Sequence, residues 1–390
     1  MLTMVHGNTA IIEKGMFKVD RKFHVGMQAY VNGIRMPVTT VNPETPPGAR
    51  IMDPIEVPCK DLPYQVLTVK MNGDWQPLPS EISRIREQIS RSKLVYDGGS
   101  LGTAKMARAL GVPYILVLEY DLATQITVAT SQVHSKLRQA VRTVRCAWNH
   151  ATDEIPNIRG AKSVHCNGYP VYRASARYNS NRLLYLDSRM SSDMMIPAGQ
   201  LISRLTSRRQ RPLRLLYSGR YERLKGADDA VRVAVECLRR GLDIEMHFYG
   251  QGTLRAEMED IAKSASTAGR IHIHDAIAYP ELVEISRSFD LFVCCHIQND
   301  PSCTYLESFG AGLPIVGYAN RMWAALSEAS LAGLASRLGR PEKVADDVQR
   351  LASDYAGLSS MSEKALAFAM EHSYEHEFAK RIDALNAATQ

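Results

Sequence analysis

The sequence has no long apolar run, no cysteine framework and no strong charge of either sign, and each absence excludes a class of protein. No stretch approaches the ~20 consecutive apolar residues that a membrane-spanning helix needs. Met1–Val5 runs directly into His6-Gly7-Asn8, which does not fit a signal peptide. The seven cysteines are odd in number and scattered, several within apolar segments, which predicts reduced thiols and a cytoplasmic setting. No Cys/His spacing indicates a zinc site.

The composition is that of an ordinary globular chain. The 390 residues are 45% hydrophobic and 23% charged, enough for two domains with full cores. The formal charge of +6 is modest for this length. Because basic and aromatic residues do not interleave and no known module appears, we expect no nucleic-acid partner. Anionic small molecules account for the charge equally well.

The chain alternates strands and helices in two series. Strands are expected in the first series at 2–5, 38–41, 93–96, 114–119, 163–166 and 183–186, and in the second at 213–217, 244–249, 271–274, 291–295 and 315–318. Two such series favour two Rossmann-like, doubly wound α/β domains over one large sheet. Pro197, Gly199 and the basic cluster 207–212 interrupt the pattern, so the boundary is placed between residues 200 and 201.

The turn 218–226, Ser-Gly-Arg-Tyr-Glu-Arg-Leu-Lys-Gly, is the most informative stretch. It follows an apolar strand and leads into a helix with an apolar stripe from Ala230 to Leu238. Two cations, Arg220 and Lys225, are thereby held at a strand-to-helix junction beside two glycines. Such junctions bind phosphates, since helix N-termini offer free amides and the positive end of a dipole.

A second motif follows the strand at 291–295. Asp300-Pro301 is expected to be an N-cap and the first position of a short helix that ends at Gly310 and Gly312. Glu307 lies in this helix, and the amides of Ser302, Cys303 and Thr304 lie at its start. A carboxylate suits a ribose diol and the amides suit a diphosphate. With Arg220 and Lys225, these groups outline a pocket for a nucleoside diphosphate.

The two motifs carry a resemblance to the retaining glycosyltransferases of family 4, which have the GT-B fold of two Rossmann-like domains facing a central cleft. That family has a Gly-Arg-x4-Lys-Gly turn, whose Arg and Lys neutralise the donor diphosphate. It also has two glutamates eight positions apart, followed by a small-residue turn and Pro-x-Val. Here the second glutamate is Glu307, and the first falls on Asn299. The resemblance is specific over residues 212–320.

This sequence departs from the family where the family contacts the sugar. Asn299 replaces a glutamate, and the usual Gly-Phe-Gly reads Asp300-Pro301-Ser302. Binding of the diphosphate and the ribose therefore carries over better than sugar preference. The resemblance also implies that the turns at Gly219 and Gly250 line the donor cleft and that backbone at Asp275-Ala276 meets the base.

The resemblance assigns residues 1–200 to the acceptor side and 201–372 to the nucleotide sugar, with the helix of 373–390 crossing back onto the first domain. In the first domain, His24, Glu119 and Asp121 are candidates for the acceptor side, because they are expected near the carboxyl edge of the sheet. Each has an ordinary alternative: a helical histidine often packs, and acids after strands often cap the next helix.

The expected reaction is transfer of a sugar from a nucleoside diphosphate, such as a UDP- or GDP-sugar, to a hydroxyl of a glycan or lipid-linked acceptor, as in polysaccharide synthesis. Arg220, Lys225 and Asn299 are the catalytic candidates. We expect no metal or other cofactor, because no Asp-x-Asp pair stands on a loop after a strand. Two alternatives share the pocket: a nucleotide-sugar 2-epimerase, and an inactive nucleotide-sugar-binding protein if Asn299 reflects lost catalysis.

A helix expected over 134–150 bears on location. Leu137, Val141, Val144 and Trp148 make one apolar stripe, flanked by Lys136 and three arginines. Such a helix can lie on an anionic membrane surface, which would place the protein at the inner face of a membrane. A helix that buries its stripe on the domain core is the more common arrangement.

Overall fold

The computed structural model describes residues 1–46, 48–51, 53–98, 101–131, 133, 135–265 and 269–390. His134, the first residue of the helix expected at 134–150, lies outside them. The chain forms two compact units, one of residues 1–185 with 377–390 and the other of residues 186–376. The expected boundary at 200/201 thus differs from the structure by fifteen residues, because residues 186–200 pack on the second unit, where the Ile196 amide donates to the Gly310 carbonyl at 2.8 Å.

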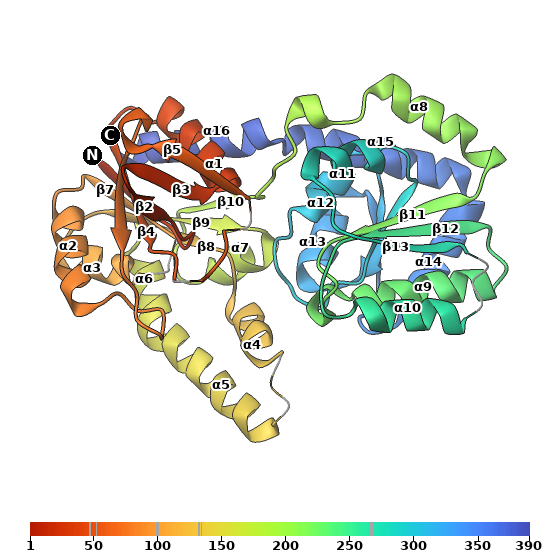
Figure 1. The fold of residues 1–390 in the computed structure, drawn as a ribbon, viewed down its shortest axis with the longest axis horizontal. Helices are drawn as coiled ribbons and strands as arrows, with labels where there is room; N and C mark the ends of the chain where they lie inside the picture. Colours follow the sequence, from red (N-terminus) through yellow and green to blue (C-terminus); the bar gives the residue numbers. More distant parts are fainter. Residues whose placement is uncertain (47, 52, 99–100, 132, 134, 266–268) are drawn as a thin grey trace. The chain divides into compact units, whose positions relative to one another are not determined.

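The first unit is built on a seven-stranded sheet in the order β10-β9-β8-β7-β1-β4-β6 (Figure 1). All its neighbouring strands are parallel. The strands are β1 (Leu2–Val5), β4 (Val38–Pro43), β6 (Gln65–Val69), β7 (Leu94–Asp97), β8 (Tyr114–Leu118), β9 (Ser163–Asn167) and β10 (Arg182–Tyr185). Continuous apolar runs such as Tyr114–Leu118 form strands of this kind because both faces of the sheet are covered.

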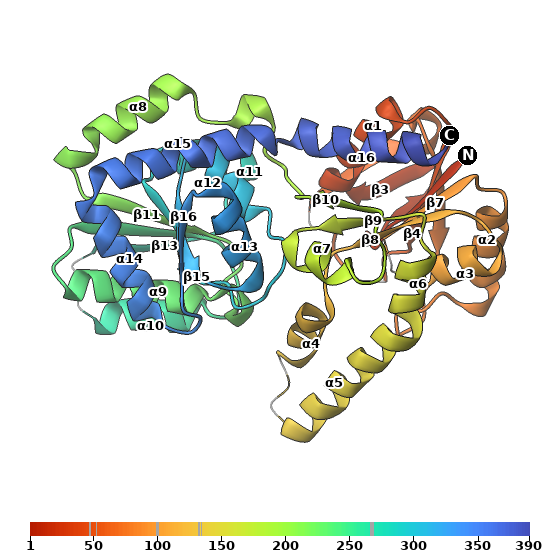
Figure 2. The ribbon, with the colours of Figure 1, turned by 180° about the vertical axis from the view of Figure 1, so that it is seen from behind.

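Helices cover both faces of this sheet. The helices of the unit are α1 (Arg21–Gly33), α2 (Pro79–Ser90), α3 (Thr103–Ala109), α4 (Leu122–Thr130), α5 (Lys136–Asn149), α6 (Ile155–Gly160), α7 (Tyr169–Ser175) and most of α16 (Tyr374–Ala388). Ile85 and Ile89 of α2 and Ala104 and Ala107 of α3 join the core on one face. On the other face α16 packs on α1, where Gly33 gives the Ile382 side chain room that a Cβ would fill (Figure 2).

A small antiparallel sheet, with two strands before α1 and one after β4, was not predicted. It runs in the order β2-β3-β5, with β2 (Ile11–Glu13), β3 (Met16–Asp20) and β5 (Pro54–Pro58). The β2–β3 hairpin turns on Lys14 and Gly15, with φ of 50° and 75°. Two positive φ values in a two-residue loop are the geometry that matches the twist of the flanking strands.

The second unit is built on a six-stranded parallel sheet in the order β13-β12-β11-β14-β15-β16. Its strands are β11 (Leu213–Ser218), β12 (Ile244–Tyr249), β13 (Ile271–His274), β14 (Leu291–Cys294), β15 (Ile315–Tyr318) and β16 (Gly333–Ser336). In chain order this is the 3-2-1-4-5-6 arrangement of a doubly wound fold. The order reverses between β11 and β14, so ligands are expected at the carboxyl ends of these two strands.

The helices of the second unit are α8 (Ala198–Ser207), α9 (Ala227–Arg239), α10 (Arg255–Ser264), α11 (Tyr279–Ser286), α12 (Thr304–Gly310), α13 (Arg321–Ser330), α14 (Pro341–Ser353) and α15 (Tyr355–Glu371). Buried residues of α9, α10 and α14 form one core with β11, β12 and β14. Figures 1 and 2 show α11, α12 and α13 on the other face, with α15 outside α12. The predicted α/β class with two doubly wound sheets is confirmed.

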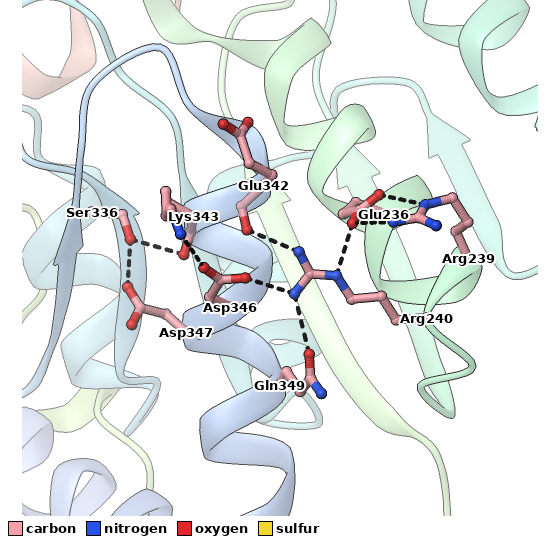
Figure 3. Close-up of polar contacts among 9 residues, drawn as sticks. All are labelled: Glu236, Arg239, Arg240, Ser336, Glu342, Lys343, Asp346, Asp347 and Gln349. Atoms are coloured by element: carbon pink, nitrogen blue, oxygen red, sulfur yellow. Dashed lines mark hydrogen bonds and ion pairs between the residues drawn. The ribbon is translucent and has the colours of Figure 1, made fainter.

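A polar network joins α9 to α14 at the edge of this unit (Figure 3). The Arg240 guanidinium donates to Glu236, Asp346, Gln349 and the Glu342 carbonyl at 2.8–3.2 Å. Arg240 is 20% exposed as a side chain, so solvent screens these contacts less than those of a fully exposed pair. The network fixes α9, whose first residues follow the Gly-Arg turn, against the rest of the unit.

Candidate functional site

The turn after β11 depends on glycines at two positions. Gly226 caps α9 with a φ of +58°, and a Cβ there would lie 1.9 Å from the Cys295 carbonyl oxygen. At Gly250, after β12, a Cβ would lie 1.9 Å from the Gly219 carbonyl oxygen. The backbones of the β11, β12 and β14 loops thus approach so closely that no side chain fits. This contact between loops is the local reason for the glycine at 250.

Lys225 lies inside this packed turn, with 8% of the residue exposed. Its ammonium donates to Asp300 Oδ2 at 2.9 Å. The buried Tyr217 hydroxyl donates to the carbonyls of Arg220 and Lys225 at 3.0 and 3.3 Å, which holds the backbone between the two cations. Arg220 itself is exposed. One cation is therefore fixed and paired, and the other extends into solvent.

The loop after β14 brings His296 beside both cations. His296 is 1% exposed, and neither ring nitrogen has a hydrogen-bond partner among the described residues. Burial, with the positive charges of Lys225 and Arg220, holds the pKa of His296 well below its usual value. The ring is therefore neutral at pH 7 and offers one donor and one acceptor. Nothing in the sequence pattern singled out this histidine.

The two departures from the family pattern, Asn299 and Asp300, have different environments. Asn299 Oδ1 accepts a hydrogen bond from the Arg321 amide at 2.8 Å, at the start of α13. The Asp300 carboxylate turns to Lys225, and its Oδ1 is buried without a partner among the described residues. A carboxylate thus lies where the phosphate-binding lysine is expected to meet an anion.

The expectation that Asp300 and Pro301 begin the following helix is wrong. The helix α12 starts at Thr304, with Cys303 at its N-cap and no side-chain cap. The Asp300 side chain pairs with Lys225 and does not cap the helix. Between Asp300 and Thr304 the chain forms a turn in which the Ser302 amide donates to the Asp300 carbonyl at 2.9 Å. Ser302, Cys303 and Thr304 are half-buried at the start of α12.

Glu307 of α12 is held by an arginine that the sequence did not single out. Arg189 Nε and Nη2 donate to Glu307 Oε1 at 2.9 and 2.7 Å, and the guanidinium stacks 4.1 Å above the Tyr279 ring. Glu307 is only 11% exposed as a side chain. At the other end of α12, the buried Arg204 donates to the Ala311 and Gly312 carbonyls at 2.8 and 2.7 Å. Arg189 therefore holds the carboxylate, and Arg204 holds the end of the helix that carries it.

The loop after β13 carries the residues expected near a base. The Tyr221 hydroxyl donates to the His274 carbonyl at 2.6 Å, which ties this loop to the Gly-Arg turn. Asp275 and Ala276 are exposed, and Asp275 pairs with Arg255 at 2.5 Å. Asp275 and Ala276 are thus accessible to solvent, whereas Lys225 is buried.

The candidate acceptor residues of the first unit are not brought together. His24 lies within α1, where it is 6% exposed and its Nδ1 is 3.1 Å from the Tyr64 hydroxyl. Asp121 caps α4, accepting from the Thr124 amide and hydroxyl at 2.9 and 2.7 Å. The ordinary alternatives thus describe these two residues.

Glu119 instead lines a pocket of about 520 Å³ at the carboxyl ends of β7 and β8. The other polar lining residues are Asp97, Lys105, Tyr120, Gln125, Asn149, Asp153, Glu154 and Asn157. Asp153 pairs with Lys105 at 3.0 Å, and Glu154 pairs with His150 at 2.8 Å. Four carboxylates and three amides around one space suit a ligand rich in hydroxyl groups, since each can accept hydrogen bonds from them.

Within the described part of the chain, no three His, Cys, Asp or Glu side chains are placed to hold a metal ion. Asp228 and Asp229, at the start of α9, are both engaged by Arg232. All seven cysteines are free thiols. No helix among the described residues is long and apolar enough to cross a membrane.

Part of the second unit is similar in sequence to known glycosyltransferases. Residues 212–354 match the model of the family described as Glycosyl transferases group 1. A curated relative, D-inositol 3-phosphate glycosyltransferase 1 of Catenulispora acidiphila, is 26% identical over 182 residues, which make up 44% of this chain and 43% of that protein. The match thus covers less than half the length of that relative.

The whole chain has the fold of known GT-B glycosyltransferases, as predicted. Anabaena HepE in complex with UDP is similar with a TM-score of 0.65 and 11% identity, covering 99% of each chain. Sucrose-phosphate synthase from Thermosynechococcus elongatus gives a TM-score of 0.65 at 14% identity, covering 99% of this chain and 98% of that one. WaaG, a glycosyltransferase involved in lipopolysaccharide biosynthesis, gives 0.63 at 12% identity, covering 98% and 99%.

Proposed function

We propose that this protein is a retaining glycosyltransferase that moves a sugar from a nucleoside diphosphate to an acceptor hydroxyl without a bound metal. The observation that carries the proposal is the convergence of Arg220, Lys225 and His296 where the strand order reverses between β11 and β14. This is where an open α/β sheet binds its ligand. The seven free cysteines support a reducing compartment.

The reaction releases a nucleoside diphosphate, and the protein must stabilise its negative charge. Lys225 is preorganised by its burial, and the exposed Arg220 reaches the outer oxygens of the same group. The fixed Lys225 and the solvent-exposed Arg220 lower the barrier because their positive charges stabilise the charge that develops on the leaving oxygen. The retained configuration and the transfer of the acceptor proton to the leaving phosphate are what the resemblance implies, and no side chain is needed as a general base.

The remaining donor contacts follow from the same unit. Glu307, held by Arg189, accepts hydrogen bonds from the ribose hydroxyls, and the exposed backbone of Asp275 and Ala276 meets the base. The neutral His296 can donate to the sugar or the phosphate. UDP is the first nucleotide to test, because UDP is bound in the HepE structures that this fold resembles.

The pocket at Glu119 is proposed as the place of the acceptor, a glycan or lipid-linked precursor such as those used in polysaccharide synthesis. Its four carboxylates are suited to hydroxyl groups of a sugar. Glu119 is the acceptor-side candidate that lines this pocket, so Glu119→Gln should raise the KM for the acceptor and leave the affinity for the donor nucleotide unchanged.

The proposal is tested by calorimetric titration with UDP-, GDP- and ADP-sugars in chelator, followed by NMR of the donor. One donor should bind, and Lys225→Ala should abolish turnover while the thermal unfolding of the protein stays cooperative. Arg239→Ala is the matched control, because it removes a cation that is 70% exposed from the same unit.

Other outcomes point elsewhere. A new sugar formed without acceptor would indicate the 2-epimerase, and binding without any reaction would indicate a binding protein. Wild-type rates in Lys225→Ala would contradict the diphosphate role. Loss of activity in chelator that magnesium or manganese restores would overturn the metal-free mechanism.

A further inference from the structure

Helix α5 has an apolar stripe that no part of its unit covers. Leu137, Val141, Val144 and Trp148 are 76%, 61%, 68% and 68% exposed, and no residue of the helix is buried. The helix packs against α4, and Figure 1 shows it extending away from the sheet of the first unit. Its half-buried residues, 139, 143 and 146, lie on the opposite side from the stripe. The common arrangement, a stripe buried on the domain core, is therefore not what this helix adopts.

The charge around the stripe has one sign. No aspartate or glutamate occurs between Asp121 and Asp153, whereas Lys136, Arg138, Arg142 and Arg145 all lie in α5. All four cations are exposed. At helical spacing, Arg138 and Arg145 border the stripe on one side and Lys136 on the other. The exposed surface of the helix is thus apolar in the middle and cationic at its margins.

We propose that α5 docks this protein on an anionic phospholipid surface, with the stripe inserted at the headgroup boundary. Interfacial helices have this combination of a narrow apolar face and flanking lysines and arginines. The amphipathic indole of Trp148 suits the same boundary. This docking goes beyond the proposed function and does not depend on it.

A second copy of the chain is the other occupant to consider, and the charges disfavour it. Pairing two α5 helices along their stripes would bring eight cations together with no acid in either helix to neutralise them. Like charges brought together across an interface are destabilising. An anionic bilayer instead gains attraction from each cation near its surface.

The docking helix leads directly into the pocket of the first unit. After Asn149 the helix continues as a π-turn (His150–Glu154) and then as α6, and Asn149, Asp153, Glu154 and Asn157 from this segment line the pocket. Pro156 has no amide hydrogen, so it cannot complete the regular helical ladder there. Trp148 and Asn149 are adjacent in the chain. Resting on the proposed function, this continuity favours an acceptor whose hydroxylated headgroup is carried by the lipid.

Vesicle binding tests the docking without any assay of activity. The full chain should co-sediment with vesicles rich in phosphatidylglycerol at about 0.05 M salt, and release at about 0.5 M salt, where charges are strongly screened. Replacing Lys136, Arg138 and Arg145 together by glutamine should weaken binding by about two orders of magnitude, given the attraction per cation. Arg142 is left in place because it donates to the Ala129 carbonyl.

Tryptophan fluorescence reports the insertion itself. Trp323 is fully buried, so Trp75→Phe leaves Trp148 as the one exposed indole. In that background, phosphatidylglycerol vesicles should shift the emission to the blue. Leu137→Ser with Val144→Ser should abolish the shift, and Ile202→Ser, which changes an isolated exposed residue on α8, should not.

Three results would overturn the proposal. The first is failure to bind anionic vesicles at low salt. The second is equal binding by the wild type and the Leu137→Ser/Val144→Ser protein. The third is a lipid-free dimer in sedimentation velocity that this double substitution dissociates, since that would assign the stripe to a second copy. Vesicle binding without glycosyl transfer would leave the docking intact and count against the proposed function alone.

Discussion

Replacing Asp300 by asparagine should tighten the binding of UDP. Lys225 Nζ lies 2.9 Å from Asp300 Oδ2, and the two side chains are 10% and 13% exposed. An incoming diphosphate needs the same ammonium and is repelled by the same carboxylate. Asparagine keeps the shape of the side chain and removes the charge, so the anion no longer competes for Lys225.

The size of the effect follows from the pair that must be broken. A hydrogen bond to a charged group contributes about 1.5–3 kcal/mol. Lys225 retains part of that contact if it is shared between Asp300 and the phosphate, so the lower end applies. About 1.4 kcal/mol corresponds to a tenfold change in Kd. We therefore expect UDP to bind about tenfold more tightly to Asp300→Asn than to the wild type.

Calorimetry of UDP binding measures this directly. Asp243→Asn is the matched control, because it removes one negative charge from an exposed carboxylate of the same unit. The unliganded Asp300→Asn protein should also be less stable, since Lys225 loses its partner, and UDP should raise its Tm more than that of the wild type. Weaker UDP binding would refute the reasoning and would mean that Asp300 orients Lys225 toward the donor.

The main sheets could be predicted because their strands are continuous apolar runs between helical patterns. The ends of strands β11 to β15 differ from the predicted ends by at most one residue, and both ends of β1 match the prediction. The small sheet was missed because β5 begins and ends with proline, which argues against a strand, although Lys14-Gly15 was a hairpin signal. The unit boundary was missed because residues 186–197 form no strand or α-helix, and their place in the second unit depends on contacts distant in sequence, such as those of Ile196 with Gly310 and of Met194 with Arg287.

Those parts of the site were predictable whose residues lie close together in the sequence. The Gly-Arg-x4-Lys-Gly turn carries its own glycines, so its geometry follows from sequence. Asp300 was misread because an aspartate before a proline is a strong helix-start signal, and its true partner lies 75 residues away. Arg189 lies 118 residues from Glu307 and belongs to no motif, so the folded chain was needed to find it.

Three further predictions concern Arg189, Arg240 and His165. Arg189→Ala should weaken UDP binding about tenfold, because Glu307 loses the charge-assisted bonds that orient it; an unchanged Kd in calorimetry would show that Glu307 does not meet the nucleotide. Arg240→Ala should lower the free energy of unfolding in urea by about 1–2 kcal/mol, since several partners lose one donor, whereas the exposed Arg239→Ala should change it by less than about 0.5 kcal/mol. The third concerns acid. Burial, with a smaller contribution from the charge of Arg381, lowers the pKa of the fully buried His165 to about 3, below the 6.5 expected when unfolded. The unfolded chain therefore binds a proton that the folded one does not, so this stability is complete above pH 6.5 and falls as the pH drops toward 3. By pH 5 the loss should reach about 2 kcal/mol. His165→Gln removes the titrating group, so its stability should fall less steeply between pH 7 and 5 than that of the wild type, and parallel curves would show that His165 does not titrate in this way.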